Sequence, residues 1–354
     1  MAKLKSLYFS SAHTGSGKTE LVLGIASLLE EKGYSIGYFR PISRAKGKSA
    51  LDTEMQVMAK IFGIDEASIS TVFLEPVYFE TMKKNQDSLR DRILAGYNVM
   101  KDSYDVVLIE GAKKYNNYMS FQLDDASLSV QMDNSPVISV NMFENDEDIC
   151  DLLTQKEIMV ARQANYAGCI FTRVPKIMLG RLQQEFIPYI DELGIKTYGA
   201  MAYDQRLAAP TFREIMTDLG GQLLDVDDSI YNLDALVYTI MIGAMSSHSA
   251  LSYLRSGKKG IIITGGDRSD IVLTALETDI VGIILTGNLY PDVHVISAAR
   301  EKGVPILLVP YDTFTTATKV EQVSAGLQAD EKDVCKDMVQ SAINIDDIIQ
   351  LLTP

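Results

Sequence analysis

The chain has 354 residues, of which 47% are hydrophobic and 23% are charged, a composition that excludes disorder as its main state. Lys and Arg total 33 while Asp and Glu total 47, so the formal net charge is −14. A chain this acidic is a poor general binder of nucleic acid, whose phosphates require a cationic face. At roughly 150 residues per domain, the length predicts two or three domains.

The sequence contains no membrane or export signal that we can identify. Its longest apolar runs are far shorter than the roughly 20 residues that a spanning helix needs, and its N-terminus leads into a strand-like run with no cleavage site. Its three cysteines, Cys150, Cys169 and Cys335, are widely spaced and form no CxxC pair. These features predict a protein of the reducing cytoplasm without a disulfide framework.

The first two thirds of the chain alternate short β-branched runs with amphipathic segments, which is typical of βαβ units and a parallel sheet. Residues 88–100 illustrate the helical pattern, because apolar side chains recur there on one face. The predicted strands are residues 4–10, 35–39, 105–109, 136–141, 168–172 and 197–202.

A second run of the same kind begins late in the chain. We predict a first domain over residues 1–220, a second over 221–325, and an acidic tail over 326–354 that ends in a short helix, residues 345–352. The predicted strands of the second domain are residues 237–245, 260–264, 280–285 and 305–309, and the helices are 247–254, 267–276, 292–300 and 313–322. The fold class is therefore α/β, a parallel sheet flanked by helices and then a smaller α/β domain.

Residues 10–19, SSAHTGSGKT, follow the first strand and open a helix, which is the context of a phosphate-binding P-loop. Gly15 and Gly17 let backbone N–H groups face a phosphate, Lys18 supplies a charge, and Thr19 offers a hydroxyl to Mg²⁺. Ala12 stands where the motif has its first glycine. The alternative, a glycine-rich turn with a chance lysine, is disfavoured by the strand, loop and helix together. The candidate nucleotide-binding residues of the loop are His13, Thr14, Gly15, Ser16, Gly17, Lys18 and Thr19, although a histidine here is more often a turn residue.

Two carboxylates are candidate Mg²⁺ ligands beside Thr19. Glu110 ends the apolar strand 105–109, where it faces the ligand crevice of a parallel sheet and needs a partner. Asp52 precedes a helix, and a plain N-cap explains it equally well. Arg40 lies at the end of the second strand, where a cation can meet an anionic ligand. If the chain is an enzyme, Lys18 and Arg40 are the candidate catalytic residues.

The segments SSAHTGSGKTE, GYFRPI, DVVLIEGA and GCIFTRVP, with Asp52 between the second and third, resemble the dethiobiotin synthetase-like P-loop family over roughly residues 4–205. That family includes ATP-dependent carboxylate-activating enzymes and the N-terminal segment of long phosphate acetyltransferases. The resemblance implies ATP and Mg²⁺ as ligands, Thr19, Asp52 and Glu110 around the ion, and Thr172 and Arg173 near the nucleotide.

The chain departs from the synthetases at the substrate end of this pattern. Arg40 replaces their lysine, Lys113 and Lys114 replace glycines, and Thr172-Arg173 replaces an asparagine that reads the base. Arginine is no simple substitute for a lysine that guides a reactive group. The departures place the dethiobiotin substrate in doubt.

The second predicted domain places polar turns after all four of its strands, and in a parallel sheet these meet at one edge, where ligands bind. Two of the turns, GGDRSD and LTGN, resemble the motif of the DRTGG domain over about residues 220–325. Arg268 at a helix N-terminus opposes the helix dipole, so we expect an acidic neighbour or a bound anion beside it. Asp267 is as readily an N-cap. The candidate residues for a small anion or nucleotide are Gly265, Gly266, Asp267, Arg268 and Thr286.

Three hypotheses follow. The chain is a regulatory protein that couples ATP–Mg²⁺ at the P-loop to a ligand of the DRTGG domain; or a dethiobiotin synthetase-type ligase; or a non-catalytic subunit of a phosphate acetyltransferase whose catalytic chain is encoded separately. We expect no phosphate acetyltransferase activity from the chain alone. We also expect a homodimer, because related P-loop proteins pair near their nucleotide sites and aromatic residues crowd the segment after Glu110. These are Tyr115, Tyr118 and Phe121, with the apolar Met119 among them, and a covered core segment explains them equally well.

Overall fold

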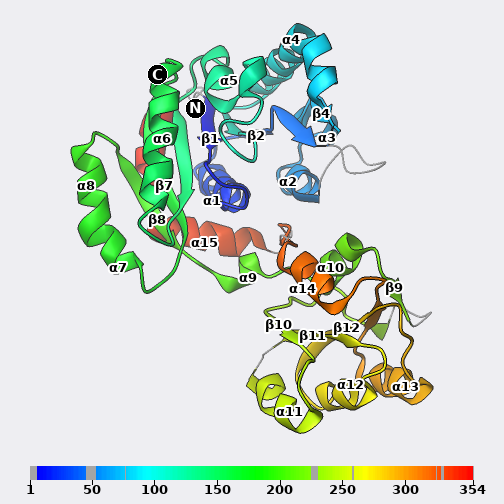
Figure 1. Cartoon of the computed structure of the whole chain (residues 1–354). Helices are drawn as coiled ribbons and strands as arrows, with labels where there is room; N and C mark the ends of the chain where they lie inside the picture. Colours follow the sequence, from blue (N-terminus) through cyan, green and yellow to red (C-terminus); the bar gives the residue numbers. More distant parts are fainter. Residues whose placement is uncertain are drawn as a thin grey trace. The chain divides into compact units, whose positions relative to one another are not determined.

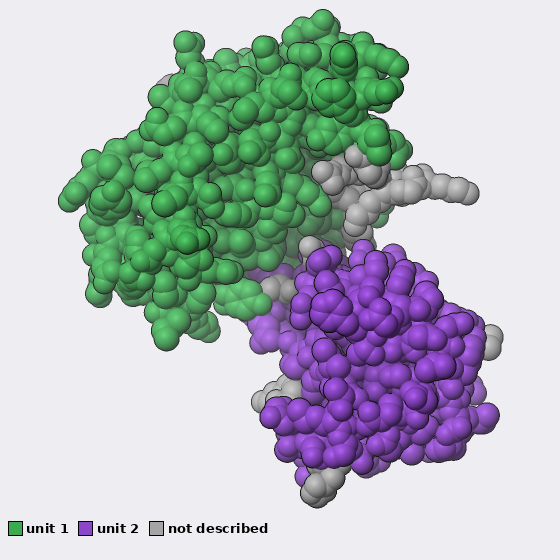
Figure 2. Space-filling view, in the orientation of Figure 1, with its two compact units in different colours: residues 1–204, 327–354 green, residues 205–326 purple. Residues whose placement is uncertain are grey.

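The computed structural model describes residues 6–44, 53–75, 77–224, 230–256, 259–323, 325–327 and 331–353. It divides the chain into two compact units, residues 1–204 with 327–354 and residues 205–326 (Figure 2). Among the described residues, no helix is both long and apolar enough to cross a bilayer.

The first unit is built on a six-stranded sheet in the order β2-β5-β1-β6-β7-β8, and all of its strand pairs are parallel (Figure 1). Its middle strands are buried along their whole length, as expected of a sheet covered on both faces. The strands are β1 (Ser6–Ser10), β2 (Ile36–Phe39), β5 (Val106–Glu110), β6 (Val137–Met142), β7 (Tyr166–Val174) and β8 (Thr197–Ala202). All six predicted strands are confirmed.

Helices and a small second sheet complete this unit. A parallel pair, β3 (Ile42–Arg44) and β4 (Val72–Leu74), extends beyond β2. The predicted helix 88–100 is the C-terminal half of the longer α4. The helices are α1 (Lys18–Glu31), α2 (Thr53–Phe62), α3 (Glu66–Ile69), α4 (Phe79–Ser103), η1 (Met119–Phe121), α5 (Asp125–Gln131), α6 (Asp148–Ala161), α7 (Leu179–Arg181), η2 (Leu182–Phe186) and α8 (Ile187–Glu192).

The C-terminal segment belongs to this first unit and is not a separate tail, although its predicted final helix, residues 345–352, is confirmed. Residues 327–354 form α15 (Lys332–Ala342) and α16 (Ile345–Leu352), and α15 packs along α1 (Figure 1). Cys335 and Val339 of α15 and Ile348 and Leu352 of α16 are buried, while two lysines of α15 pair with acidic residues at the end of α1. The segment thus docks through the apolar faces of its helices although its composition is acidic.

The second unit holds a five-stranded sheet in the order β10-β11-β12-β13-β9, parallel except for β9. Its strands are β9 (Gln222–Leu223), β10 (Thr239–Ile242), β11 (Gly260–Gly265), β12 (Ile280–Thr286) and β13 (Ile306–Leu308). Its helices are α9 (Gln205–Ala208), α10 (Phe212–Leu219), α11 (Ser247–Ser256), α12 (Ser269–Ala275), α13 (Val293–Lys302) and α14 (Thr313–Glu321). The predicted first strand, residues 237–245, shortens to β10.

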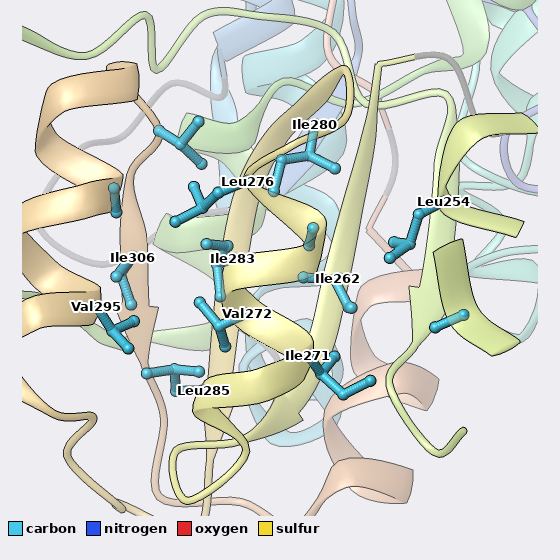
Figure 3. Close-up of a cluster of buried hydrophobic side chains, with 14 of the residues drawn as sticks. Leu254, Ile262, Ile271, Val272, Leu276, Ile280, Ile283, Leu285, Val295 and Ile306 are labelled. Carbon is cyan, nitrogen blue, oxygen red and sulfur yellow. The ribbon is translucent and has the colours of Figure 1, made fainter. Parts of the chain in front are cut away.

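Alternating side chains of β11 fill a hydrophobic core on each face of this sheet. Ile262 points to one face with Ile283, where helices α11, α12 and α13 cover it (Figure 3). Ile261 and Ile263 point to the other face, under α10 and α14. A side chain at Gly282 of β12 would overlap the ring of Phe212 in α10. Since α10 is part of this core, the boundary lies at residues 204/205 and not near residue 220 as expected.

Candidate functional site

The P-loop connects β1 to α1, as predicted. Gly15 and Gly17 have φ of 73° and 76°, in the left-handed region that glycine adopts without steric penalty. Gly17 is the residue before the first turn of α1, which starts at Lys18. The N-terminus of a 14-residue helix therefore faces the loop, which is the usual arrangement for holding an anion.

Two buried side chains of the loop indicate what it can hold. Lys18 is buried and donates to Ser11 Oγ, and burial lowers the pKa of its ammonium despite the nearby carboxylates of Glu110 and Asp125. Ser16 is 2% exposed, and its hydroxyl has no hydrogen-bond partner among the residues that the structure describes. An orphaned donor and a cation beside a helix N-terminus fit a phosphate group.

Glu110 at the end of β5 is the centre of a buried polar cluster. Its Oε1 accepts from Thr19 Oγ1 at 3.0 Å and from Arg40 Nη2 at 2.7 Å. Its Oε2 accepts from the Tyr38 hydroxyl at 2.8 Å. Arg40 Nη2 also donates to Glu54 Oε2 at 3.1 Å. The structure therefore brings together three predicted residues, Thr19, Arg40 and Glu110, and adds two more.

Sequence reasoning missed Tyr38 and Glu54, although both left a signal. Tyr38 precedes Arg40 by two residues, so both side chains leave the same side of the extended backbone. Glu54 lies in the first turn of α2, two residues after the predicted ligand Asp52. Asp52 itself lies outside the described residues. A spacing argument that stopped at Asp52 could not show that Glu54 reaches the cluster.

The oxygen atoms of this cluster fit a hard divalent cation. Mg²⁺ prefers oxygen ligands, usually one or two carboxylates together with substrate phosphates. The hydroxyl of Thr19 and the carboxylates of Glu54 and Glu110 supply such donors, and they lie beside the loop that would hold the phosphates. The donor set is thus suited to Mg²⁺, whereas Lys18 and Ser16 are suited to the anion.

Asp125 of α5 is a further buried carboxyl at the P-loop that the sequence did not reveal. It accepts from Ser10 Oγ at 2.6 Å, from the Tyr8 hydroxyl at 3.2 Å and from the backbone N–H of Ala112 at 2.9 Å. Burial raises its pKa to about 7, partly opposed by these hydrogen bonds and by Lys18. Asp125 ties the end of β1 to the loop that follows Glu110.

The remaining predicted nucleotide-site residues line the same loop. Thr172 at the end of β7 donates to the backbone oxygen of Ser16, and Arg173 pairs with Glu20 of α1 at 2.8 Å. A side chain at Gly17 would lie 3.5 Å from Arg173 Nε. His13 Nε2 lies 2.9 Å from a carboxylate oxygen of Asp151 on α6. The last of the predicted loop residues, Thr14, is exposed.

The aromatic segment after Glu110 is a covered core segment and not an exposed surface. Tyr115, Tyr118 and Phe121 are buried within the chain. Tyr118 packs edge-on against Tyr78, and Phe121 packs against Phe79. Met119, the fourth residue of the group, is half-buried. These side chains therefore give no support to the expected homodimer.

In the second unit, contacts join the four polar turns at the carboxyl ends of the strands. The Thr286 hydroxyl lies 3.0 Å from that of Thr313, and a side chain at Gly266 would overlap the backbone oxygen of Leu289. Arg268 donates to the backbone oxygen of Met245 at 2.8 Å. The sequence therefore predicted the meeting of these turns correctly.

Arg268 has an internal partner, which was the alternative to a bound anion. It is the N-cap residue of α12, and its guanidinium pairs with Asp270 at 3.2 Å, which lowers the pKa of that carboxyl. The helix starts two residues later than predicted, so Asp267 is not its N-cap. Its carboxylate lies over Gly265, where an added Cβ would lie 2.4 Å from Oδ1.

Comparison with known protein families assigns both units. Residues 5–201 match the family described as an AAA domain, and residues 214–323 match the DRTGG domain. Among curated proteins, the phosphate acetyltransferase of Synechocystis is 29% identical over 342 residues, which cover 91% of this chain and 48% of that protein. The phosphate acetyltransferase of Nitratidesulfovibrio vulgaris is 25% identical, covering 92% of this chain and 48% of that protein. The chain thus spans about half the length of these relatives.

Two solved structures show a distant likeness to parts of the chain. The CBS and DRTGG domains of Clostridium perfringens pyrophosphatase, complexed with diadenosine tetraphosphate, align over 41% of this chain and 70% of that chain, with 15% identity and a TM-score of 0.29. A plasmid partition protein of Borrelia burgdorferi bound to AMPPNP aligns over 58% of this chain and 89% of that chain, with 13% identity and a TM-score of 0.39. At these scores neither likeness carries an argument about function.

Proposed function

Because the chain belongs to the AAA-domain family and carries a DRTGG domain, we propose that it is an ATP–Mg²⁺-binding regulatory protein that couples its P-loop to a ligand of the DRTGG domain. The observation that carries the proposal is the P-loop itself. Buried Lys18 and orphaned Ser16 lie at a helix N-terminus, beside the hydroxyl of Thr19 and the carboxylate of Glu110.

The residues divide between the two ligands. Gly15, Gly17 and Lys18 would hold the phosphates, while Thr19, Glu54 and Glu110 would hold Mg²⁺. Asp52, which lies outside the described residues, stays a proposed ligand of the ion. When bound, the ion would neutralise charge on the phosphates. Arg173 lies beside Gly17, where its guanidinium adds positive charge at the mouth of the loop. This arrangement supports binding, and we assign no hydrolytic step to it.

The proposal extends to the second unit through the converging turns. We propose that Gly265, Gly266, Asp267, Arg268 and Thr286 form the site for a small anion or nucleotide at this sheet edge. The Asp270 partner of Arg268 leaves the guanidinium about one third exposed. An anionic ligand would then compete with Asp270 for a cation that is already positioned.

Calorimetry with ATP and Mg²⁺ on the full chain tests the P-loop. Wild type is expected to bind, whereas Lys18→Ala is expected to lose binding and keep its circular dichroism spectrum. Lys32→Ala is the matched control, because Lys32 lies at the opposite end of α1 in a surface pair with Asp346. Binding that survives Lys18→Ala would overturn the proposal.

Nuclear magnetic resonance of the full chain tests the second site. Adenine nucleotides or acetyl phosphate are expected to shift the backbone amide signals of residues 264–269. Unchanged signals at these residues count against the site.

The relatives favour a second candidate function. Phosphate acetyltransferases match over nearly the whole of this chain, so the chain can serve as the nucleotide-responsive part of such an enzyme. This candidate predicts that ATP–Mg²⁺ on this chain alters the rate of an acetyltransferase mixed with it. An acetyltransferase whose rate is the same with and without the chain excludes it.

A further inference from the structure

Arg40 lies at the point toward which the candidate metal ligands converge. Its Nη2 is 2.7 Å from Glu110 Oε1, 3.1 Å from Glu54 Oε2 and 3.4 Å from Thr19 Oγ1. Arg40 and Glu110 are both buried, 8% and 4% exposed. One guanidinium nitrogen therefore contacts an oxygen of each of the three candidate Mg²⁺ ligands that the structure describes.

Arg40 is the counter-charge of the buried carboxylate in this cluster. A buried carboxylate without a counter-charge is strongly unfavourable. Glu110 has its charge offset by Arg40, and its two oxygens accept hydrogen bonds from Thr19, Arg40 and Tyr38. A guanidinium within hydrogen-bonding distance of all three ligand oxygens occupies the space between them and repels a second cation.

We propose that Arg40 is a built-in stand-in for the divalent cation, and that Mg²⁺ reaches Thr19, Glu54 and Glu110 only when Arg40 withdraws. The inference rests on the proposed nucleotide–Mg²⁺ function of the same site. Without nucleotide, the guanidinium holds the two carboxylates. A bound phosphate offers it another anionic partner, so metal and nucleotide bind together, each raising the affinity of the other.

The chemistry of an arginine suits this role. A lysine is a compact point charge with three rotatable donors, whereas arginine presents a planar fork that can contact several oxygens at once. Arg40 reaches Glu54, Glu110 and Thr19 through Nη2. Because the three contacts share one nitrogen, withdrawal of Nη2 would release all three oxygens together.

Titration of the full-length protein with Mn²⁺, followed by electron paramagnetic resonance without nucleotide, tests the inference. Wild type is expected to show no tight site, whereas Arg40→Gln is expected to gain one site with affinity raised about tenfold or more. The double variant Arg40→Gln/Glu110→Gln is expected to lose it again. Arg181→Gln is the matched control, because Arg181 also pairs with two carboxylates, Asp146 and Glu185, but on the surface. It is expected to titrate like wild type.

Thermal unfolding gives a second readout, which does not depend on activity. Arg40→Gln leaves Glu110 without its counter-charge, so its Tm is expected to fall and to recover with Mn²⁺ by more than wild type gains. If Arg40→Gln does not fold, Mn²⁺ titration of wild type and of Glu110→Gln still tests the inference. The inference is overturned if nucleotide-free wild type binds Mn²⁺ tightly and Glu110→Gln abolishes that binding. Failure of ATP to bind wild type with or without metal instead refutes the proposed function, and the Mn²⁺ comparison remains readable.

Discussion

At the scale of single residues, Asp125 makes the stability of the folded chain depend on pH in a way that can be measured. Its pKa in the folded protein is about 7, above the usual 3.8, because the carboxyl is buried. The folded state therefore holds a proton that the unfolded state releases between pH 4 and 7. Stability falls as the pH rises through that window, by at most about 1.4 kcal/mol per pH unit, and then levels off.

The variant Asp125→Asn removes this titration and keeps the shape of the side chain. We expect the free energy of unfolding of wild type, relative to the variant, to decrease from pH 4 to pH 7 in urea titrations at each pH. Asp102→Asn, at an exposed position of α4, is the control and should leave the wild-type profile unchanged. A wild-type-minus-Asp125→Asn difference that stays flat, or that grows with pH, contradicts the raised pKa.

The residues of the site that the sequence predicted are those whose role is local. Lys18, Thr19 and Glu110 are defined by a motif or by the end of an apolar strand. Asp125 could not be found in that way, because α5 meets the P-loop only in the folded unit. Tyr38 left only its two-residue spacing from Arg40 as a signal. The partner of Arg268 was left open because an acidic neighbour and a bound anion both satisfy the same electrostatic requirement.

At the scale of elements, the contact between α1 and α15 depends on one glycine. A Cβ at Gly24 would lie 2.4 Å from Val339 Cγ2 and 2.5 Å from the backbone oxygen of Cys335. Gly→Ala in a helix normally stabilises by about 0.5–1 kcal/mol, but here it forces two helices apart. We expect Gly24→Ala to destabilise the protein, and Gly24→Val to cost about 1–3 kcal/mol in urea unfolding.

Thiol labelling locates the effect of this change. Cys335 in α15 is buried, and burial raises the pKa of its thiol, so it should react slowly in wild type and faster in Gly24→Val. Gly180→Ala is the control, because a Cβ there would meet nothing within 4 Å. Equal stability and equal labelling rates of wild type and Gly24→Val would contradict the role of Gly24 in the contact between α1 and α15.

The sequence predicted α16 but not α15, nor where the two helices dock. Residues 345–352 carry a strong amphipathic pattern, whereas residues 332–342 are dominated by charges around Cys335 and Val339. Their burial is decided by Gly24, more than 300 positions away in the chain. Local periodicity predicts that a helix forms, but the small residue that leaves room for it, Gly24, lies on another element, α1.

At the scale of the whole molecule, the two units differ in how many segments of the chain build them. Unit 2, residues 205–326, is continuous, while unit 1 needs both ends of the chain. Val339, Ile348 and Leu352 are fully buried. At about 1.5–3 kcal/mol per side chain they contribute roughly 5–9 kcal/mol, comparable with the total stability of a typical domain, about 5–15 kcal/mol.

We therefore expect residues 205–326 to fold alone, with cooperative urea unfolding followed by circular dichroism, because both faces of their sheet carry a hydrophobic core. Residues 1–204 alone are expected to aggregate or to unfold at much lower urea, because α1 loses its cover. Joining residues 1–204 to 327–354 through a flexible Gly/Ser linker should restore the midpoint, since the lost contacts are supplied again. If residues 1–204 alone unfold at the same urea concentration as the linked form, the expectation is wrong. In that case the burial of apolar side chains in α15 and α16 does not stabilise the first unit.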